Sequence, residues 1–466
     1  MADLAILNGS VVAHPDAGAS GAPIRSDIVI DQGKIVALVT PGERIEADTV
    51  IDAANLLVLP GAIDIHFHCR APAFPERGDF FTESRAAAAG GVTTYFEMPI
   101  SNPCASTAEV WRNRCELALA NTVVNVGLFA APGRLDRKEI DGMVEAGAIG
   151  FKVFMTAAVK GRESEFDGLC LTDLADIAQA LELIQPTGLR CVFHAEVQGL
   201  VDLYMARARE SDLADHLRHR RSRPAVAEAT AVAGLLALAE SIRTPIHIAH
   251  VSSAESVALI KRAREAGISV SAETCPHYLL FDESVLERVG PYGKINPPIR
   301  GPEDREALWQ AIDEGVIDVI ATDHAPFTAE EKEASWGNII DAPPGHPGVE
   351  MLVPLVLDQA LRGRMTLAKA VALISTTPAQ LFGLYPRKGT LWPGADADIT
   401  LYDPTGEHEV RLEDGWSRAA ACNWLYQGMR LHGNVAATIV GGKTVYRGGK
   451  IVGTRGDGAL AHPLQN

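Results

Sequence analysis

The sequence has no excess of basic residues. Its 42 Lys and Arg are outnumbered by 59 Asp and Glu, which gives a formal net charge of −17 at pH 7. A protein that binds nucleic acid usually needs a basic footprint. The acids are spread along the chain, so the charge predicts solubility and excludes a nucleic-acid partner.

Long hydrophobic runs are also missing. No uninterrupted apolar stretch reaches the ~18 residues that a membrane-spanning helix requires, and the first residues, Met-Ala-Asp-Leu, lack the basic start of a signal peptide. We therefore expect no membrane partner and a cytoplasmic location.

Cysteine is sparse and scattered. The seven cysteines are odd in number and show no Cys-x-x-Cys spacing, which excludes a disulfide framework and a structural zinc knuckle. Cys69 and Cys275 lie beside the motifs described below, and we interpret both as small packing residues.

The two ends of the chain have the same character. Residues 4–9 and 28–36, and then 397–403 and 437–446, are short β-rich runs separated by turn residues. We expect these runs to form one small β-sandwich, with residues 1–57 and 390–466 as its two parts.

The middle of the chain, residues 58–389, alternates strands with amphipathic helices. Residues 253–265 and 302–314 carry apolar side chains at helical spacing with charges on the opposite face. Such units predict a parallel sheet, and their combined length favours an α/β fold of the (β/α)8 barrel type. An open doubly wound sheet is the alternative, but no Gly-x-Gly-x-x-Gly opens a helix after the first strand.

Metal-ligand residue types stand at the ends of the predicted barrel strands. They are His66, His68, Lys152, His194, His250 and Asp323. The carboxyl ends of all strands in a parallel barrel meet at one face, so these residues would converge on one pocket. That pocket would hold metal.

Each residue also has a simpler interpretation. His66 and His68 point to the same side of a strand and could bind one ion, yet such a pair also occurs by chance at strand edges. Lys152 lies among apolar residues, where a neutral amine could react with carbon dioxide to give a bridging carbamate, or its head could reach water. Asp323 ends a long apolar strand, or it could cap a helix. The simpler interpretations become improbable when all six residues occur in this order.

Together these motifs resemble the amidohydrolase superfamily, in its cyclic amidohydrolase branch of dihydroorotases, allantoinases and hydantoinases. The resemblance runs from residues 60–68 to 393–398 and implies a (β/α)8 barrel with a β-sandwich from both termini. It also implies two divalent ions, with zinc preferred over manganese or cobalt. His66, His68 and Asp323 would bind the more buried ion, His194 and His250 the second, and carboxylated Lys152 both.

The resemblance further implies a reaction and an assembly. A hydroxide shared by the two ions would attack a cyclic amide, while Asp323 moves the proton as general base and then general acid. The partners would be a small cyclic amide and further copies of the chain, in a homodimer or homotetramer.

The substrate-side motifs point in different directions. Arg70 and Asn296 resemble dihydroorotase residues that contact the substrate, and Gly348 begins a Gly-Val-Glu segment found in dihydroorotases and allantoinases. Ile100 and Phe327, however, stand where dihydroorotases have polar residues. Residues 150–155 and 273–279 look more like allantoinase or hydantoinase, but Ala157 replaces the tyrosine of hydantoinases.

We therefore expect hydrolysis of a five- or six-membered ureide or imide ring, with allantoin-like rings ranked above dihydroorotate and both above 5-substituted hydantoins. Hydantoinase or dihydropyrimidinase activity is the alternative within the family. A non-catalytic homologue that serves as an assembly partner is the alternative outside it, although such proteins usually lose metal ligands and this chain keeps all six.

Overall fold

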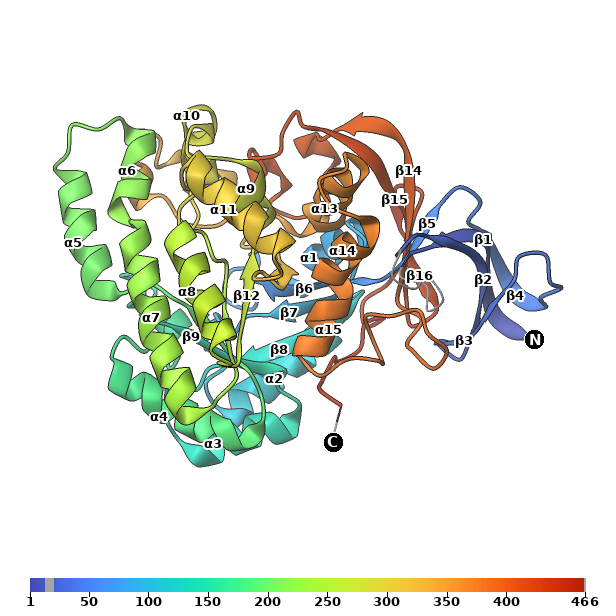
Figure 1. Ribbon diagram of the computed structural model, residues 1–466, viewed down its shortest axis with the longest axis horizontal. Coiled ribbons are helices and arrows are strands. Elements are labelled where there is room, and N and C mark those ends of the chain that lie inside the picture. The colour runs from blue at the N-terminus through green and yellow to red at the C-terminus, as the bar shows by residue number, and fades with distance from the viewer. Residues whose placement is uncertain (13–20, 465–466) are drawn as a thin grey trace.

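The computed structural model describes residues 1–12 and 21–464, which form a barrel and an adjoining sheet (Figure 1). Eight parallel strands of the described chain follow one another in sequence order around the barrel. They are β6 (Ala62–Phe67), β7 (Val92–Glu97), β8 (Asn125–Ala130), β9 (Gly150–Phe154), β10 (Cys191–His194), β11 (Ile246–Ile248), β12 (Val270–Thr274) and β13 (Val319–Ile320).

The barrel closes between the segment after β13 and the end of β6. The N–H of His68 donates to the carbonyl of His324 at 2.7 Å, and the N–H of His324 donates to the carbonyl of His66 at 3.2 Å. The predicted (β/α)8 barrel is therefore confirmed, and the doubly wound alternative is wrong.

Helices cover the outside of the barrel, so almost every residue of its strands is buried. This explains why the strands read as continuous apolar runs. The helices are α1 (Phe80–Ala89), α2 (Ala108–Leu119), α3 (Arg137–Ala146), α4 (Leu174–Ile184), α5 (Gln198–Arg209), α6 (Asp215–Ser222), α7 (Ala225–Ile242), α8 (Ala254–Glu265), α9 (Pro276–Leu280), α10 (Val285–Val289), α11 (Pro302–Asp313), α12 (Ala329–Glu333), α13 (Leu352–Leu361), α14 (Leu367–Val371) and α15 (Thr377–Leu381).

The two amphipathic patterns seen in the sequence correspond to α8 and α11. The Ser253 hydroxyl caps α8 by accepting from the N–H of Ser256 at 3.3 Å, which satisfies one of the free donors of the first turn. Helix α11 follows Gly301 and begins with Pro302, whose missing N–H costs nothing at this position.

Both termini contribute to the second sheet, a mixed sheet of nine strands in the described residues. Its strands are β1 (Ala2–Val11), β2 (Ile24–Asp31), β3 (Lys34–Val39), β4 (Ala47–Asp52), β5 (Leu57–Pro60), β14 (Ile399–Glu409), β15 (Arg430–Val440), β16 (Lys443–Arg447) and β17 (Lys450–Ile451). Figure 1 shows this sheet beside the barrel, with β1 to β4 farthest from it.

Strand β5 joins the two halves of this sheet, since it pairs in parallel with β1 and antiparallel with β14. The apolar run 58–65, which reads as one strand in the sequence, is thus divided at Gly61. A Cβ at Gly61 would lie 2.1 Å from Oγ1 of Thr93. The chain therefore crosses from sheet to barrel at a point where only glycine fits.

The chain returns to the barrel near its C-terminus. The N–H of Val126 in β8 donates to the carbonyl of Ala459 at 3.0 Å, and the N–H of Ala461 donates to the carbonyl of Val126 at 2.8 Å. Residues of the C-terminal part therefore contact the barrel directly.

One helical stretch of the described chain, Asp215–Ile242, is long and apolar enough to cross a membrane by length and composition. It consists of α6 and α7. Helix α7 buries Ala231, Val232 and Leu235 in the main hydrophobic core. Its apolar composition is accounted for by this packing.

Candidate metal centre

The barrel brings the six predicted ligands to the carboxyl ends of its strands. His66 lies in β6 and His68 directly after it, Lys152 lies in β9, and His194 ends β10. His250 and Asp323 follow β11 and β13. All six are buried.

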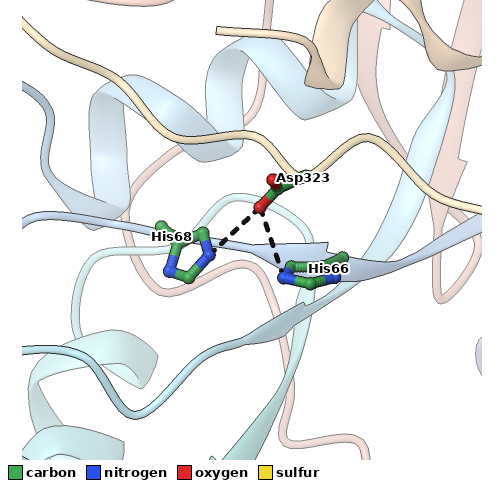
Figure 2. Close-up of side chains that lie close together, drawn as sticks. All are labelled: His66, His68 and Asp323. Carbon is green, nitrogen blue, oxygen red and sulfur yellow. Dashed lines mark ion pairs between the residues drawn. The ribbon is translucent and has the colours of Figure 1, made fainter. Parts of the chain in front are cut away.

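His66, His68 and Asp323 form the first group (Figure 2). Oδ1 of Asp323 lies 3.3 Å from Nε2 of His66 and 3.3 Å from Nε2 of His68. Two ligand atoms on one tetrahedral zinc ion are separated by about 3.3 Å when each bond is about 2.0–2.1 Å. The group therefore fits one divalent ion.

His194 and His250 form the second group. Nδ1 of His194 lies 3.0 Å from Nε2 of His250, and the rings of His250 and His66 are 5.1 Å apart. Burial lowers the pKa of both His194 and His250. These imidazoles are therefore neutral at pH 7, which is the form that binds metal.

Lys152 completes the constellation. Its Nζ is fully buried and has no hydrogen-bond partner among the described residues. Burial lowers the pKa of Lys152 to about 8, although Glu273 and Asp323 oppose that shift. A buried amine of this kind is costly to leave unpaired, and carboxylation would turn it into an anionic ligand. The donor set thus fits two divalent ions.

Two carboxylates fix which ring nitrogens face the centre. Nδ1 of His66 donates to Glu273, and Nε2 of His194 donates to Oε2 of Glu196 at 2.7 Å. The opposite nitrogen of each ring is then left without a proton and free to bind metal. Glu273 also accepts from the N–H of His250 at 3.2 Å.

Two of the predicted ligands have strained backbones. His250 and Asp323 have φ angles of +38° and +50°, in the left-handed region that residues other than glycine rarely adopt. Such strain persists only where surrounding contacts enforce it. Next to Asp323, Thr322 donates its N–H to Asp64 at 3.0 Å and also its hydroxyl, so the strand end is held from β6.

A cavity opens above these ligands. Its walls include Arg70, Asn296, Ile100, Ala157 and Phe327. The side chain of Arg70 lies against the ring of Phe327, 4.8 Å from its centroid, and donates through Nε to the carbonyl of Pro326 at 3.3 Å. No ion pair involves Arg70 within residues 1–12 and 21–464, so its terminal nitrogens remain available to a ligand.

Gly348 does not line this cavity. A Cβ on Gly348 would lie 3.1 Å from the His346 ring and 3.3 Å from Cβ of Thr322. The N–H of Val349 donates to Nδ1 of His324 at 3.3 Å, which links the Gly-Val-Glu segment to the residue after Asp323. Gly345 lines the cavity instead.

Sequence reasoning missed several cavity residues and both orienting carboxylates. Arg162, Arg223 and Thr156 also line the cavity. Glu196 stands two residues after His194, and this spacing could have indicated it. No comparable spacing from a predicted ligand pointed to Arg223 in the sequence.

Comparison with known proteins agrees with this geometry. The profile of the Amidohydrolase family matches residues 57–445. An allantoinase from Rubrobacter xylanophilus is 35% identical over 460 residues, covering 97% of this chain and 95% of that protein. A dihydroorotase from Methanothermobacter thermautotrophicus is 34% identical over 426 residues, covering 91% and 92%.

One solved structure is similar to this chain over its whole length. The L-hydantoinase (dihydropyrimidinase) from Arthrobacter aurescens superposes with a TM-score of 0.92 at 30% identity, covering 99% of this chain and 100% of that one.

Proposed function

Because the chain belongs to the amidohydrolase family, in its cyclic amidohydrolase branch, we propose that it opens a five- or six-membered ureide or imide ring by metal-dependent hydrolysis. The observation that carries the proposal is the convergence of four histidines, one aspartate and one unpaired lysine beneath a single cavity.

His66, His68 and Asp323 would hold one divalent ion, and His194 and His250 the second, with carboxylated Lys152 binding both. Zinc suits this set of nitrogen and oxygen ligands. When bound, the two ions would polarise the ring carbonyl and lower the pKa of water toward ~7, which supplies a hydroxide nucleophile at neutral pH.

The chain's own groups would move the proton and hold the ring. Burial by itself would raise the pKa of Asp323, but His66, His68 and His250 hold it well below its usual range. The carboxylate is therefore ionised at pH 7, which is the form that could accept a proton from the attacking water. Asp323 would then return this proton to the departing ring nitrogen as the C–N bond breaks, so that this nitrogen leaves as part of a urea or amide group.

Arg70 and Asn296 would orient the ring through polar contacts, while Phe327 and Ile100 would keep bulk water away. A guanidinium with free donors suits a carboxylate or carbonyl on the substrate. The backbone N–H of Ala157 donates to Oε1 of Gln198 at 2.6 Å, and alanine puts no phenol into the cavity at this point.

Among possible rings, we place allantoin-like substrates first and dihydroorotate second. The 35% identity with an allantoinase supports the first, and the free donors of Arg70 support the second. The missing phenol at Ala157 places 5-substituted hydantoins third.

A matched panel of rings tests the proposal. Zinc-loaded protein would be assayed for hydrolysis of allantoin, dihydroorotate, hydantoin, dihydrouracil and a simple cyclic imide. Turnover of one of these rings is expected. Absence of turnover across the panel with metal bound would contradict the proposed substrate class.

A further inference from the structure

Arg223 lies between the cavity and one of the metal ligands. It follows α6 and directly precedes Pro224 and α7, and its side chain is 11% exposed where it lines the cavity. Its guanidinium pairs with Glu196, whose side chain is fully buried. The same oxygen of Glu196 accepts from Nε2 of His194 at 2.7 Å. Arg223 and His194 therefore bind the same carboxylate oxygen of Glu196.

Glu196 depends on Arg223 for its charge balance. Its second oxygen, Oε1, has no hydrogen-bond partner in the described part of the chain. Without Arg223, the carboxylate would keep only the imidazole of His194 as a hydrogen-bond partner among the described residues, with Arg300 as a more distant positive charge. A buried charge without an opposite charge is strongly disfavoured. The carboxylate would then be free to move, and a shift of its Oε2 would release the ring of His194.

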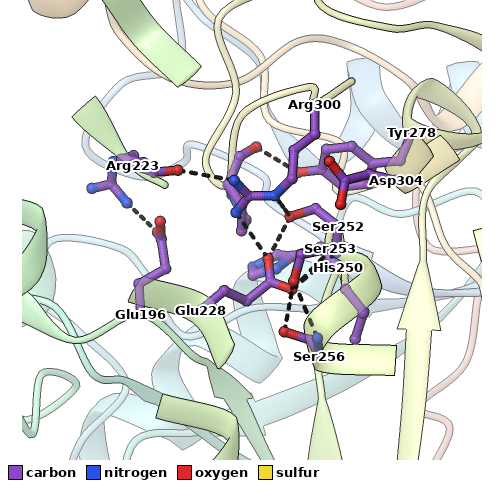
Figure 3. A network of polar contacts seen from close by, with 12 residues as sticks. Glu196, Arg223, Glu228, His250, Ser252, Ser253, Ser256, Tyr278, Arg300 and Asp304 are labelled. Carbon is purple, nitrogen blue, oxygen red and sulfur yellow. Dashed lines mark hydrogen bonds and ion pairs between the residues drawn. The ribbon is translucent and has the colours of Figure 1, made fainter. Parts of the chain in front are cut away.

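A second set of contacts holds Arg223 in place (Figure 3). Arg300 donates through Nη1 to the carbonyl of Arg223 at 3.0 Å and through Nε to Oγ of Ser252 at 2.9 Å. Its third contact is with Oε2 of Glu228, at 3.3 Å.

Glu228 connects the contacts of Arg300 to the segment that follows His250. Its Oε1 accepts from the N–H groups of Ser252 and Ser253, both at 3.2 Å. These residues lie two and three positions after His250. This polar network, part of which is drawn in Figure 3, thus contacts His194 through Glu196 and the segment after His250 through Glu228.

We propose that Arg223 is a positioning residue for the second ion, because through Glu196 it keeps Nδ1 of His194 turned toward Nε2 of His250. This inference rests on the two-metal centre of the proposed function. It differs from a role in substrate contact, since it predicts an effect on metal content in the absence of any substrate. Removal of a group that orients a metal-bound histidine typically weakens metal binding about 10–100-fold.

The test is the zinc content of four proteins: wild type, Arg223→Gln, Glu196→Gln and Arg221→Gln. Each would be loaded with zinc and dialysed against the same competing chelator, and zinc per chain would be measured by mass spectrometry. Arg221 is an exposed arginine two residues away and serves as the matched control. The thermal midpoint of each metal-free protein reports folding.

Wild type and Arg221→Gln should retain two zinc ions per chain. Arg223→Gln and Glu196→Gln should retain one, with the second bound about 10–100-fold more weakly. If Arg223→Gln does not fold, Glu196→Gln decides the matter, since it leaves the arginine in place.

Two ions held by both variants at wild-type affinity would overturn the inference and leave the two-metal centre standing. Equal loss of both ions would also overturn it, because the role would not be selective for the second ion. A single ion in wild type would contradict the two-metal centre, and the inference would fall with it.

Discussion

His194 and His250 face each other through ring nitrogens, with 3.0 Å between Nδ1 of His194 and Nε2 of His250. Nε2 of His194 already donates to Glu196, so Nδ1 offers a lone pair. Burial keeps His250 neutral by lowering its pKa. Two imidazoles arranged in this way are suited to share a cation, and the proposed function assigns them a second ion beside the one that His66, His68 and Asp323 would hold.

Replacement of Asp323 by Asn should abolish turnover and leave the fold intact. The amide cannot accept the proton from water or return it to the leaving nitrogen, and general acid–base catalysis typically contributes about 10²–10⁴-fold. The expected loss in kcat is therefore about 10²-fold or more. Asp141→Asn, at a half-exposed position on α3, is the control. Full hydrolytic activity in Asp323→Asn would refute the proposed proton transfer.

Replacement of Arg70 by Met should raise KM about 10–100-fold, which corresponds to the loss of a hydrogen bond to a charged group. The value of kcat should change little, because Arg70 does not contact the reacting atoms in this account. The KM of Arg70→Lys should lie between those of wild type and Arg70→Met, since lysine keeps the charge but cannot bind in a bidentate manner. An unchanged KM for the methionine variant would remove Arg70 from the substrate site.

Gly61 should tolerate no side chain. A Cβ there would lie 2.1 Å from Oγ1 of the buried Thr93, and overpacking of this kind costs about 1–3 kcal/mol. At Gly199 in α5, a Cβ would have open space around it, with no neighbouring group of the described chain within 4 Å. Gly199→Ala should therefore stabilise the protein by about 0.5–1 kcal/mol. Urea unfolding of Gly61→Ala and Gly199→Ala measures the free energy of unfolding of each variant. Equal stability of the two would contradict the packing at the junction of sheet and barrel.

Lys332 should make stability depend on pH. Its buried Nζ donates to the carbonyls of Pro291 at 3.2 Å and Pro343 at 2.7 Å, and burial lowers its pKa from 10.5 to about 7. Between these two values the unfolded chain binds more protons than the folded chain, so the free energy of unfolding rises with pH. The slope is at most about 1.4 kcal/mol per pH unit.

The measurement is the free energy of unfolding from about pH 6 to about pH 10 for wild type and Lys332→Met. The difference between the two proteins should change with pH above about 7 and stay constant below it, because lysine is then charged in both states. Parallel curves across the whole range would show that Lys332 keeps an ordinary pKa.

The sequence could predict the barrel and the convergence of the six candidate ligands at one end of it, because both depend on local patterns. Each of His194, His250 and Asp323 follows an apolar run, and a parallel barrel must gather such strand ends. Local patterns could not predict the residues that orient the candidate ligands. Glu273 lies 207 positions from His66, and Arg223 lies 27 from Glu196, so no local pattern joins them.

One expectation failed for a packing reason. The run before His66 reads as one strand, but it is divided at Gly61 between β5 of the sheet and β6 of the barrel, where a Cβ would lie 2.1 Å from Oγ1 of Thr93. This boundary depends on packing between residues far apart in the sequence. Gly348 does not line the cavity, and its contact with the substrate stays a prediction.

The most direct test of the central claim is ring-opening turnover measured against zinc equivalents added to metal-free protein, with the best substrate of the panel. The account predicts no activity without metal and a rise to a maximum at two equivalents per chain. Turnover that persists in metal-free protein, or a failure of zinc to restore it, would contradict metal-dependent hydrolysis at this centre.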